Sequence, residues 1–499
     1  MNHKPKPFSR RDLLQMALAT GLLSAVDLTA GSRARASQAT MQTVDPKDRK
    51  LLFILGAWGG ASIIDSFMAV SESDSGDLFG AQSLNVFPDA GLVKPDGSNL
   101  RVPTVLDDYG IFEKPSFAMA DFVKLHGADV AAIGHSVTSV NHTIGQQRAL
   151  NGAGINRGRT LMEAMALRYG GGMVLPNCNM AADGYTRNGA DATVPAEARH
   201  ELISSPLLFA TGTHGSRGVA GAPDDALFQR ARAARKSLEE KSVFGRTFVD
   251  DLRRQKFLAS RDSQSPLIER ANVFDKLLLT DPAKLDPKYG VTLDPLAVAV
   301  RATLPGIETD RLQGQIGLAF LLAYHGISTS VTMGYSQDAY VTPEGKIVNS
   351  PIAFDFSHNN HRVAQSLMWS RTLGLLDTLI TLLKTHDYLG DPTLGKMWDR
   401  SLVYIATEFG RDKVRPFLSD SWGTAHDLNN GSVIISPLLK GNAVYGGVDP
   451  TTCLTYGFDP NTGVADKTAV MSESDVYGII AHALDLDAPA AKRFPGVVK

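Results

Sequence analysis

Five short apolar runs along the chain predict β-strands buried inside a sheet. They cover residues 51–55, 130–133, 328–333, 402–406 and 433–435. Most are rich in aliphatic or β-branched residues and end in polar or glycine-containing loops, as buried parallel strands do. Helical patterns separate several of the runs, and the clearest covers 363–384. This alternation predicts an α/β fold with a mostly parallel sheet, whose ligands bind beyond the carboxyl ends of the strands.

Two stretches depart from this alternation. Residues 224–279 are rich in Ala, Arg, Lys, Glu and Leu, which predicts several surface helices. We interpret 224–310 as a helical insertion or cap within one domain spanning 37–499. Residues 441–460 contain several glycines and prolines and predict a loop with a short hairpin.

The first 36 residues have the organisation of a twin-arginine export signal. Arg10 and Arg11 stand inside the pattern Ser-Arg-Arg-Asp-Leu-Leu-Gln, and basic residues precede them. The apolar stretch 16–26 is shorter than the roughly 20 residues that span a bilayer, and Ala34 and Ala36 frame a small-residue cleavage site. We therefore expect the twin-arginine translocase to export the folded chain, and the mature protein to be periplasmic or secreted. A cytoplasmic amphipathic start with a chance arginine pair, or retention by an uncleaved signal, is the alternative.

Composition narrows the possible partners. The formal net charge is −2 and hydrophobic residues make up 43% of the chain, as in an ordinary globular protein with no global field for nucleic acid. No segment after the signal is apolar enough to span a membrane. The two cysteines, Cys178 and Cys453, either form a disulfide, which an exported protein permits, or remain buried thiols. Haem-attachment, iron–sulfur and dinucleotide-binding patterns are missing from the sequence, which disfavours a redox protein.

The densest cluster of potential metal ligands lies just before the helical stretch that begins at 363. Asp355, His358 and His361 combine a carboxylate with two imidazoles, which are good ligands for first-row metals. If this segment opens the helix, His358 and His361 lie on one face. Alternatively, Asp355 or Ser357 caps the helix and the histidines are solvated.

Two further candidates lie in the C-terminal part of the chain. Glu408 and Arg411 follow the strand at 402–406, so Glu408 could ligate a metal and Arg411 could bind an anion through two hydrogen bonds. The alternative is an ordinary ion pair at a strand end. His426 lies in a polar, glycine-containing loop, where it is either a ligand or a structural histidine.

The loops after the first two predicted strands carry hydroxyl groups and one more carboxylate. Gly59, Gly60, Ser62 and Asp65 follow the first strand. A backbone nest for an anion, or a metal carboxylate from Asp65, competes there with a simple tight turn. His142 follows the second strand, together with the hydroxyl residues Ser136, Thr138 and Ser139. This loop could supply a nucleophile with a nearby base, although hydroxyl-rich turns are common without any chemistry.

The order of these motifs resembles the DUF1501 family, exported proteins of the alkaline phosphatase-like (sulfatase-like) superfamily. The resemblance runs from about residue 51 to the C-terminus, and its most specific element is Glu-Phe-Gly-Arg at 408–411. The other carriers are Leu-Leu-Phe-Ile-Leu-Gly-Ala-Trp-Gly-Gly at 51–60, Asn141-His142 before Gln146-Gln147, the Asp355/His358 segment, and Gly-Thr-Ala-His at 423–426 before Tyr445-Gly446.

The resemblance implies an α/β/α sandwich with a hydrolase site at the strand ends, holding one or two divalent metals such as zinc, calcium or magnesium. In that superfamily, metals activate a hydroxyl nucleophile and stabilise a transferring phosphoryl or sulfuryl group. Carried over by position, Arg411 meets the substrate anion, and Ser62 and His142 belong to the catalytic groups. The implied metal ligands are Asp65, Asp355, His358, Glu408 and His426.

Two hypotheses of function follow. The first is an exported metal-dependent hydrolase of phosphate or sulfate esters. The second is a non-catalytic relative that binds an anionic small molecule, a glycan or a partner protein through the same cleft. The second hypothesis rests on two differences from the family pattern, since Ala61-Ser62 and Ala425 stand where many members of the family carry Asp. Convergence of the candidate ligands within metal-bridging distance favours the enzyme, and scattered positions favour the binding protein.

Overall fold

The computed structural model describes residues 39–499 with the exception of 77, 105–116, 213–224, 252–253, 256–257, 259–272, 285–292, 336–339, 342–346, 349–352, 420 and 488–492. The predicted export signal, residues 1–36, lies outside the described residues. Thr40–Lys499 forms one unit, and none of its described helices is long and apolar enough to cross a membrane.

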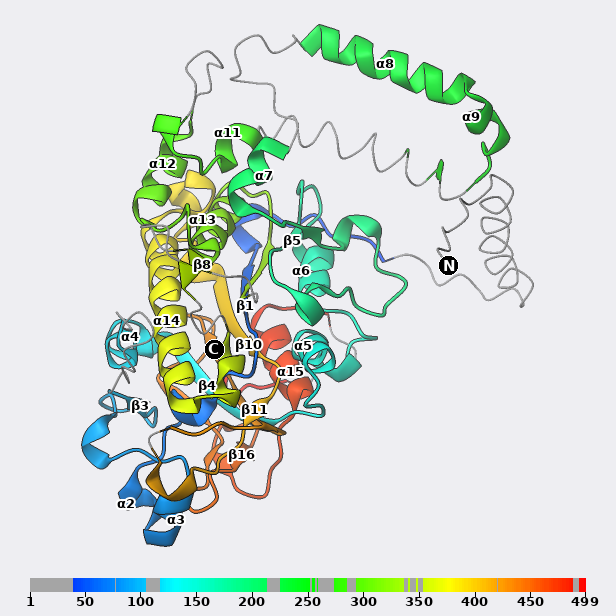
Figure 1. Cartoon of the computed structure of the whole chain (residues 1–499). Helices are drawn as coiled ribbons and strands as arrows, with labels where there is room; N and C mark the ends of the chain where they lie inside the picture. The colour runs from blue at the N-terminus through cyan, green and yellow to red at the C-terminus, as the bar shows by residue number, and fades with distance from the viewer. Residues whose placement is uncertain are drawn as a thin grey trace, which may run out of the picture. The chain divides into compact units, whose positions relative to one another are not determined.

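One eight-stranded sheet organises this unit (Figure 1). Seven of its strands run in one direction, while β13 pairs antiparallel with β10 on one side and with β4 on the other. In spatial order the strands are β14 (Ala443–Tyr445), β4 (Val130–Ser136), β13 (Asn429–Ile435), β10 (Ser401–Thr407), β1 (Leu51–Ala57), β7 (Ser330–Gly334), β5 (Asn177–Asn179) and β6 (Glu201–Leu202). The predicted α/β fold with a mostly parallel sheet is confirmed, and all five predicted strands are present.

Burial explains why the sequence revealed these five strands. Every residue of β1, β10 and β13 is buried, and apart from the two asparagines that begin β13, apolar, aromatic or small side chains occupy both faces of each strand. The three strands that the pattern did not predict, β5, β6 and β14, are only two or three residues long. Such short segments show no periodicity of their own.

Helices cover both faces of the sheet (Figure 1). One layer contains α4 (Met119–His126), α13 (Arg311–Tyr324) and α14 (His361–Thr385), and α14 confirms the helix predicted at 363–384. The other layer contains α5 (His142–Asn151), α6 (Leu161–Tyr169) and α15 (Glu473–Ala483). This arrangement is compatible with the expected α/β/α sandwich, and the alkaline phosphatase-like superfamily stays a prediction.

The segment 224–310 is helical at most of the positions that the structure describes, and its interpretation as an insertion or cap stays a prediction. It contains α8 (Asp225–Lys241), α9 (Val243–Thr247), α11 (Val273–Leu277) and α12 (Pro295–Ala302). Both α11 and α12 pack against α13, as does α7 (Pro206–Gly212), which precedes the segment.

The C-terminal region contains the predicted hairpin. β15 (Gly447–Val448) pairs antiparallel with β16 (Thr455–Phe458), and β17 (Ala465–Asp466) extends the pair to three strands. The other short elements are α2 (Glu72–Ser75), α3 (Leu78–Ser83), β2 (Leu92–Val93), β3 (Val102–Pro103), β8 (Tyr340–Val341), β9 (Ile347–Val348), β11 (Gly410–Arg411) and β12 (His426–Asp427).

The two cysteines are buried and unpaired, which decides between the two alternatives left open by the sequence. Burial raises the pKa of both thiols, Cys178 and Cys453, to about 12. Both are therefore uncharged at neutral pH and poorly suited to thiolate chemistry.

Candidate metal site

The carboxyl edge of the sheet collects side chains from distant parts of the chain. β4 and β10 end at this edge, and His142 and Glu408 follow them. β13 runs in the opposite direction, so it begins at the same edge, and His426 lies just before it. The 3-10 helix Phe354–His358 brings a further carboxylate, that of Asp355. Ligand-binding groups of open α/β sheets are expected at this edge.

His142, Asp355 and His426 form the group that could hold a metal ion among the residues described by the structure. One ligand atom from each lies within 4.8 Å of the other two. The Nε2 atoms of His142 and His426 are each 3.7 Å from Asp355 Oδ1. Atoms bound to one metal at about 2.0–2.2 Å lie within roughly 4.4 Å of one another, so small shifts suffice to bring these three onto one ion.

The second nitrogen of each imidazole is held by an acceptor outside this triad. His142 Nδ1 lies 3.1 Å from Glu408 Oε1, and His426 Nδ1 lies 2.9 Å from the carbonyl oxygen of Val140. Because both partners are acceptors, Nδ1 carries the proton in the neutral form of each ring, and in that form Nε2 presents its lone pair to the triad. Metal-binding histidines typically have this arrangement.

Negative charge surrounds the imidazole of His142. Burial opposes its protonation, but the hydrogen bond to Glu408 and the charges of Glu408 and Asp355 outweigh burial and raise the pKa of His142. Burial also raises the pKa of Asp355, yet His426 and Arg411 outweigh it and lower this pKa to about 2. The Asp355 carboxylate is therefore ionised at neutral pH. The charges that attract a proton to His142 equally favour a metal cation in its place.

Two predicted site residues, Glu408 and Arg411, lie behind the triad and not within it. Glu408 is fully buried and accepts hydrogen bonds from the Gly59 backbone N–H and from His142 Nδ1, so it orients His142. Arg411 is also fully buried, and it donates to Asp355 Oδ1 at 2.9 Å and to the carbonyl oxygen of Gly59. In this conformation Arg411 holds Asp355 in place and presents no surface to a substrate anion.

His358 lies at the exposed rim of the triad. Its Nε2 is 2.9 Å from His426 Nε2 and 3.4 Å from Asp355 Oδ1. Its side chain is 41% exposed, more than that of any triad member. Burial and the charge of Arg411 lower the pKa of His358, so its imidazole is neutral at pH 7.

His361 does not share a helical face with His358. α14 begins at His361, and Asn360 occupies the position before its first turn. Neither Asp355 nor Ser357 therefore caps this helix, and His358 belongs to the preceding 3-10 helix. The alternatives considered from the sequence assumed one continuous helix, which the structure does not contain here.

Asp65 contacts His361 and lies outside the metal group. Asp65 Oδ2 is 2.9 Å from His361 Nε2, and Asn85 Nδ2 donates to both carboxylate oxygens. Both members of the Asp65–His361 pair are buried. Burial opposes ionisation of Asp65, but the charges of His361 and Arg362 outweigh it and hold the pKa of Asp65 well below its usual range.

The structure places two of the hydroxyl groups that the sequence offered as nucleophiles in different surroundings. Ser62 is fully buried near Asp65 and its backbone N–H donates to Gln365, while its hydroxyl has no hydrogen-bond partner among the described residues. The Thr138 hydroxyl donates to Glu473. Ser62 thus belongs to the surroundings of Asp65, and its role as a nucleophile stays a prediction.

Two aromatic rings that the sequence analysis did not single out hold the imidazoles of the triad. Trp58 stacks on His142 with ring centroids 4.8 Å apart, and Phe409 stacks on His426 at 3.9 Å. Trp58 is itself fixed, because its Nε1 donates to Asp183 at 2.7 Å. Both rings stand inside segments that carry the family resemblance, 51–60 and 408–411, which was the available signal.

The fold and this site define the class of the protein as an α/β protein with a candidate metal site at the carboxyl edge of a mostly parallel sheet. A scan against protein-family models and a search of curated proteins found no match for the chain. The resemblance to the DUF1501 family accordingly stays a prediction, and the function is argued from the site.

Gly59 allows the β1 loop to approach Asp355, and an alanine there tests this contact. Gly59 has a φ of +96°, and a Cβ atom would lie 2.0 Å from Asp355 N. An alanine in the left-handed region costs roughly 1–2 kcal/mol by itself. We expect Gly59→Ala to displace Asp355 as well, and therefore to reduce the free energy of unfolding by clearly more than this amount. Urea denaturation measures the loss. Gly97→Ala is the matched control, since Gly97 has a φ of +67° but no neighbour within 4 Å. Equal losses in the two variants would contradict the close contact.

The buried pair of Asp65 and His361 predicts a large stability effect. Asp65→Ala removes the buried carboxylate that contacts both His361 and Asn85, and we expect the free energy of unfolding to fall by about 3–5 kcal/mol. Asp121→Ala, which removes only an exposed pair with Lys124, should cost at most about 1 kcal/mol. Because the folded-state pKa of Asp65 lies below the unfolded value, its contribution is present at neutral pH and is lost on acidification. The difference in free energy of unfolding between wild type and Asp65→Ala should therefore become smaller as the pH of the denaturation experiment falls. A difference that grows on acidification would contradict this assignment.

Proposed function

We propose that the protein is an exported metal-dependent hydrolase of phosphate or sulfate esters, with its metal bound by His142, Asp355 and His426. The observation that supports this is the convergence of three ligand atoms from segments far apart in the sequence. Both imidazoles have their Nδ1 atoms occupied outside the triad, as ligating histidines do. Export in the folded state, inferred from residues 1–36, suits a protein that acquires its metal before crossing the membrane.

Zinc is the metal that suits this donor set best. Two imidazoles and one carboxylate are a ligand set of catalytic zinc sites, which keep a further position open for water or substrate. Calcium and magnesium, the other ions implied by the resemblance, prefer sites built from oxygen atoms. The triad side chains are 19–30% exposed, which leaves the open position accessible.

A bound divalent metal supplies a water of lowered pKa and polarises an oxygen of the ester. The groups of the protein do the rest. Glu408 and the Val140 carbonyl keep the imidazoles in the ligating tautomer, and Arg411 orients Asp355. With a metal bound to His426 Nε2, the neutral and exposed His358 Nε2, 2.9 Å from that atom, would be placed to accept a proton from the attacking water. The resemblance implies a different role for His358, as a metal ligand, and the measurements below separate the two.

Metal content tests the triad directly. We expect mature protein purified from exported, folded material to carry about one metal ion per chain, as a single three-ligand site does. The His142→Ala/His426→Ala double variant should lose the ion, because two of three ligands are gone. His200→Ala is the control, a partly buried histidine outside the triad. Plasma mass spectrometry measures the metal, and circular dichroism verifies each fold.

A folded wild-type protein without bound metal, even after incubation with zinc, would overturn this mechanism. That result would favour the alternative, a non-catalytic protein that binds an anionic small molecule, a glycan or a partner protein through the same site.

His358→Ala distinguishes a proton acceptor from a metal ligand. We expect this variant to keep its metal while kcat for p-nitrophenyl phosphate or p-nitrophenyl sulfate falls by about 10²–10⁴-fold, the usual contribution of a general base. Steady-state kinetics and metal analysis on the same preparation provide both readouts, with His200→Ala as the control. Loss of metal together with activity would make His358 the fourth ligand.

A further inference from the structure

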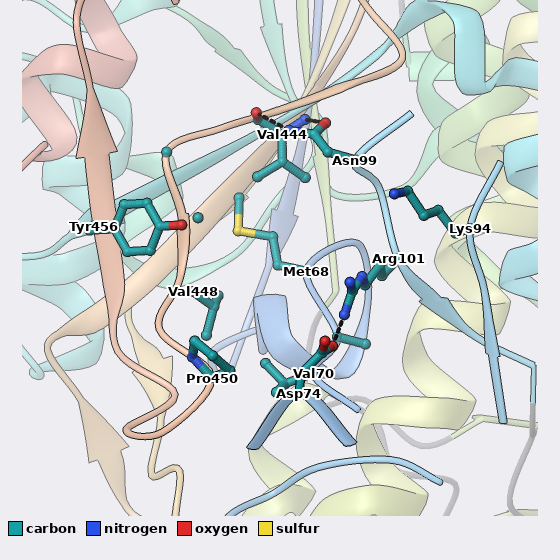
Figure 2. A pocket seen from close by; sticks show the side chains of 13 residues that line it. Met68, Val70, Asp74, Lys94, Asn99, Arg101, Val444, Val448, Pro450 and Tyr456 are labelled. Atoms are coloured by element: carbon teal, nitrogen blue, oxygen red, sulfur yellow. Dashed lines mark hydrogen bonds and ion pairs between the residues drawn. The ribbon is translucent and has the colours of Figure 1, made fainter. Parts of the chain in front are cut away.

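A cavity lies beyond the end of β14 and shares no residue with the triad (Figure 2). Its volume is about 260 Å³, slightly below the roughly 300–1,000 Å³ of pockets for drug-sized ligands. A single sugar-sized ring with its substituents fits a space of this size. The wall comes from three parts of the chain, within residues 68–74, 94–101 and 444–456.

The cavity carries an unmatched positive charge. The Lys94 side chain has no hydrogen-bond or ion-pair partner within the part of the chain that the structure describes, and Figure 2 shows its ammonium group directed toward the cavity. Arg101 and Asp74 form an ion pair on the same wall. Lys94 and Arg101 against Asp74 leave one surplus positive charge, which favours a ligand with a single negative charge.

The opposite wall is apolar and contains an aromatic ring. Met68, Val448 and Pro450 line it together with Tyr456 of β16 (Figure 2). The Tyr456 hydroxyl has no hydrogen-bond partner among the described residues, so it remains available to a ligand. An apolar wall of this kind suits the C–H surface of a hydroxylated ring, and the Tyr456 hydroxyl can form a hydrogen bond with one of its substituents.

The wall between these two sides is held by a pair of hydrogen bonds. Asn99 Nδ2 donates to the carbonyl oxygen of Val444 at 2.9 Å, and the Val444 N–H donates to Asn99 Oδ1 at 2.6 Å. These bonds fix the Lys94 segment against the end of β14. The shape of the cavity is thus held by contacts within the protein itself, which lowers the entropic cost of binding.

We propose that this cavity binds a sugar acid, a hydroxylated ring with one carboxylate. The Lys94 ammonium pairs with the carboxylate, the Arg101–Asp74 pair donates to and accepts from ring hydroxyls, and the Tyr456 wall contacts the ring face. The sugar acid is either a free monosaccharide or the end of an acidic polysaccharide. This site does not depend on the metal triad or on hydrolysis.

Titration calorimetry on the full mature protein tests the proposal with three probes: galacturonate, neutral galactose and trigalacturonate. We expect galacturonate to bind one per chain and galactose to bind at least about tenfold more weakly, as the loss of one charged hydrogen bond predicts. Lys94→Gln should weaken galacturonate binding about tenfold for the same reason. Lys124→Gln, at an exposed lysine on α4, is the matched control and should leave binding unchanged.

Each outcome decides the proposal. Stronger binding of trigalacturonate identifies a polysaccharide end, binding of galacturonate alone identifies the free acid, and both support the site. Absence of binding, equal binding of galactose, or an effect of Lys124→Gln as large as that of Lys94→Gln would overturn it. Tyr456→Leu gives a second readout, with weaker binding expected for all three probes. The melting temperature and metal content of Lys94→Gln should equal those of the wild type. A loss of galacturonate binding in this variant then reports on the cavity and not on the fold or the triad.

Discussion

The candidate metal site depends on one fully buried cation, the guanidinium of Arg411. It donates hydrogen bonds to the carbonyl oxygens of Gly59 and Thr424 and to the carboxylate of Asp355. A buried guanidinium costs several kcal/mol unless its charge is paired and its donors are used. The loop after β1, the segment before β12 and the 3-10 helix Phe354–His358 are therefore interdependent, since moving any of them leaves this charge uncompensated.

The carboxylates of Asp355 and Glu408 raise the pKa of His142 against the opposing effects of burial and of the Arg411 guanidinium. Burial raises the pKa of Glu408 itself, so its contribution requires that Glu408 is ionised. A proton on His142 or a metal ion in the triad compensates this negative charge. The protein thus contains an electrostatic reason for a cation at this position, apart from any likeness to other proteins.

The sequence indicates chemically suitable residues, but not which of them form the triad and which support it from behind. His142, Asp355 and His426 converge, as expected of residues near strand ends. Glu408 and Arg411 are adjacent in the chain to the same edge, yet both point into the protein and support the triad from behind. Phe409 and Gly410, which separate them in the chain, are also buried, so no alternation of exposed and buried positions marks the direction of these two side chains in the sequence.

Asp65 shows the same limit more strongly. A carboxylate seven residues after Trp58 was a reasonable ligand by position, but the turn after β1 carries it to His361 and Asn85. The resulting buried pair of Asp65 and His361 stabilises the start of α14 and does not contact the triad. Sequence could not reveal it, because its partners lie 20 and 296 residues away.

The sequence by itself determined the five buried strands, the long helix α14 and the residue types at the carboxyl edge, because burial on both strand faces leaves apolar runs and helices leave their own period. Only the tertiary structure decided the direction of β13. Because β13 is antiparallel to its neighbours, its beginning meets their ends, and β12 pairs His426 with Arg411 at this edge. Strand direction and pairing are set by contacts between distant segments, which leave no mark in the local pattern of apolar and polar residues.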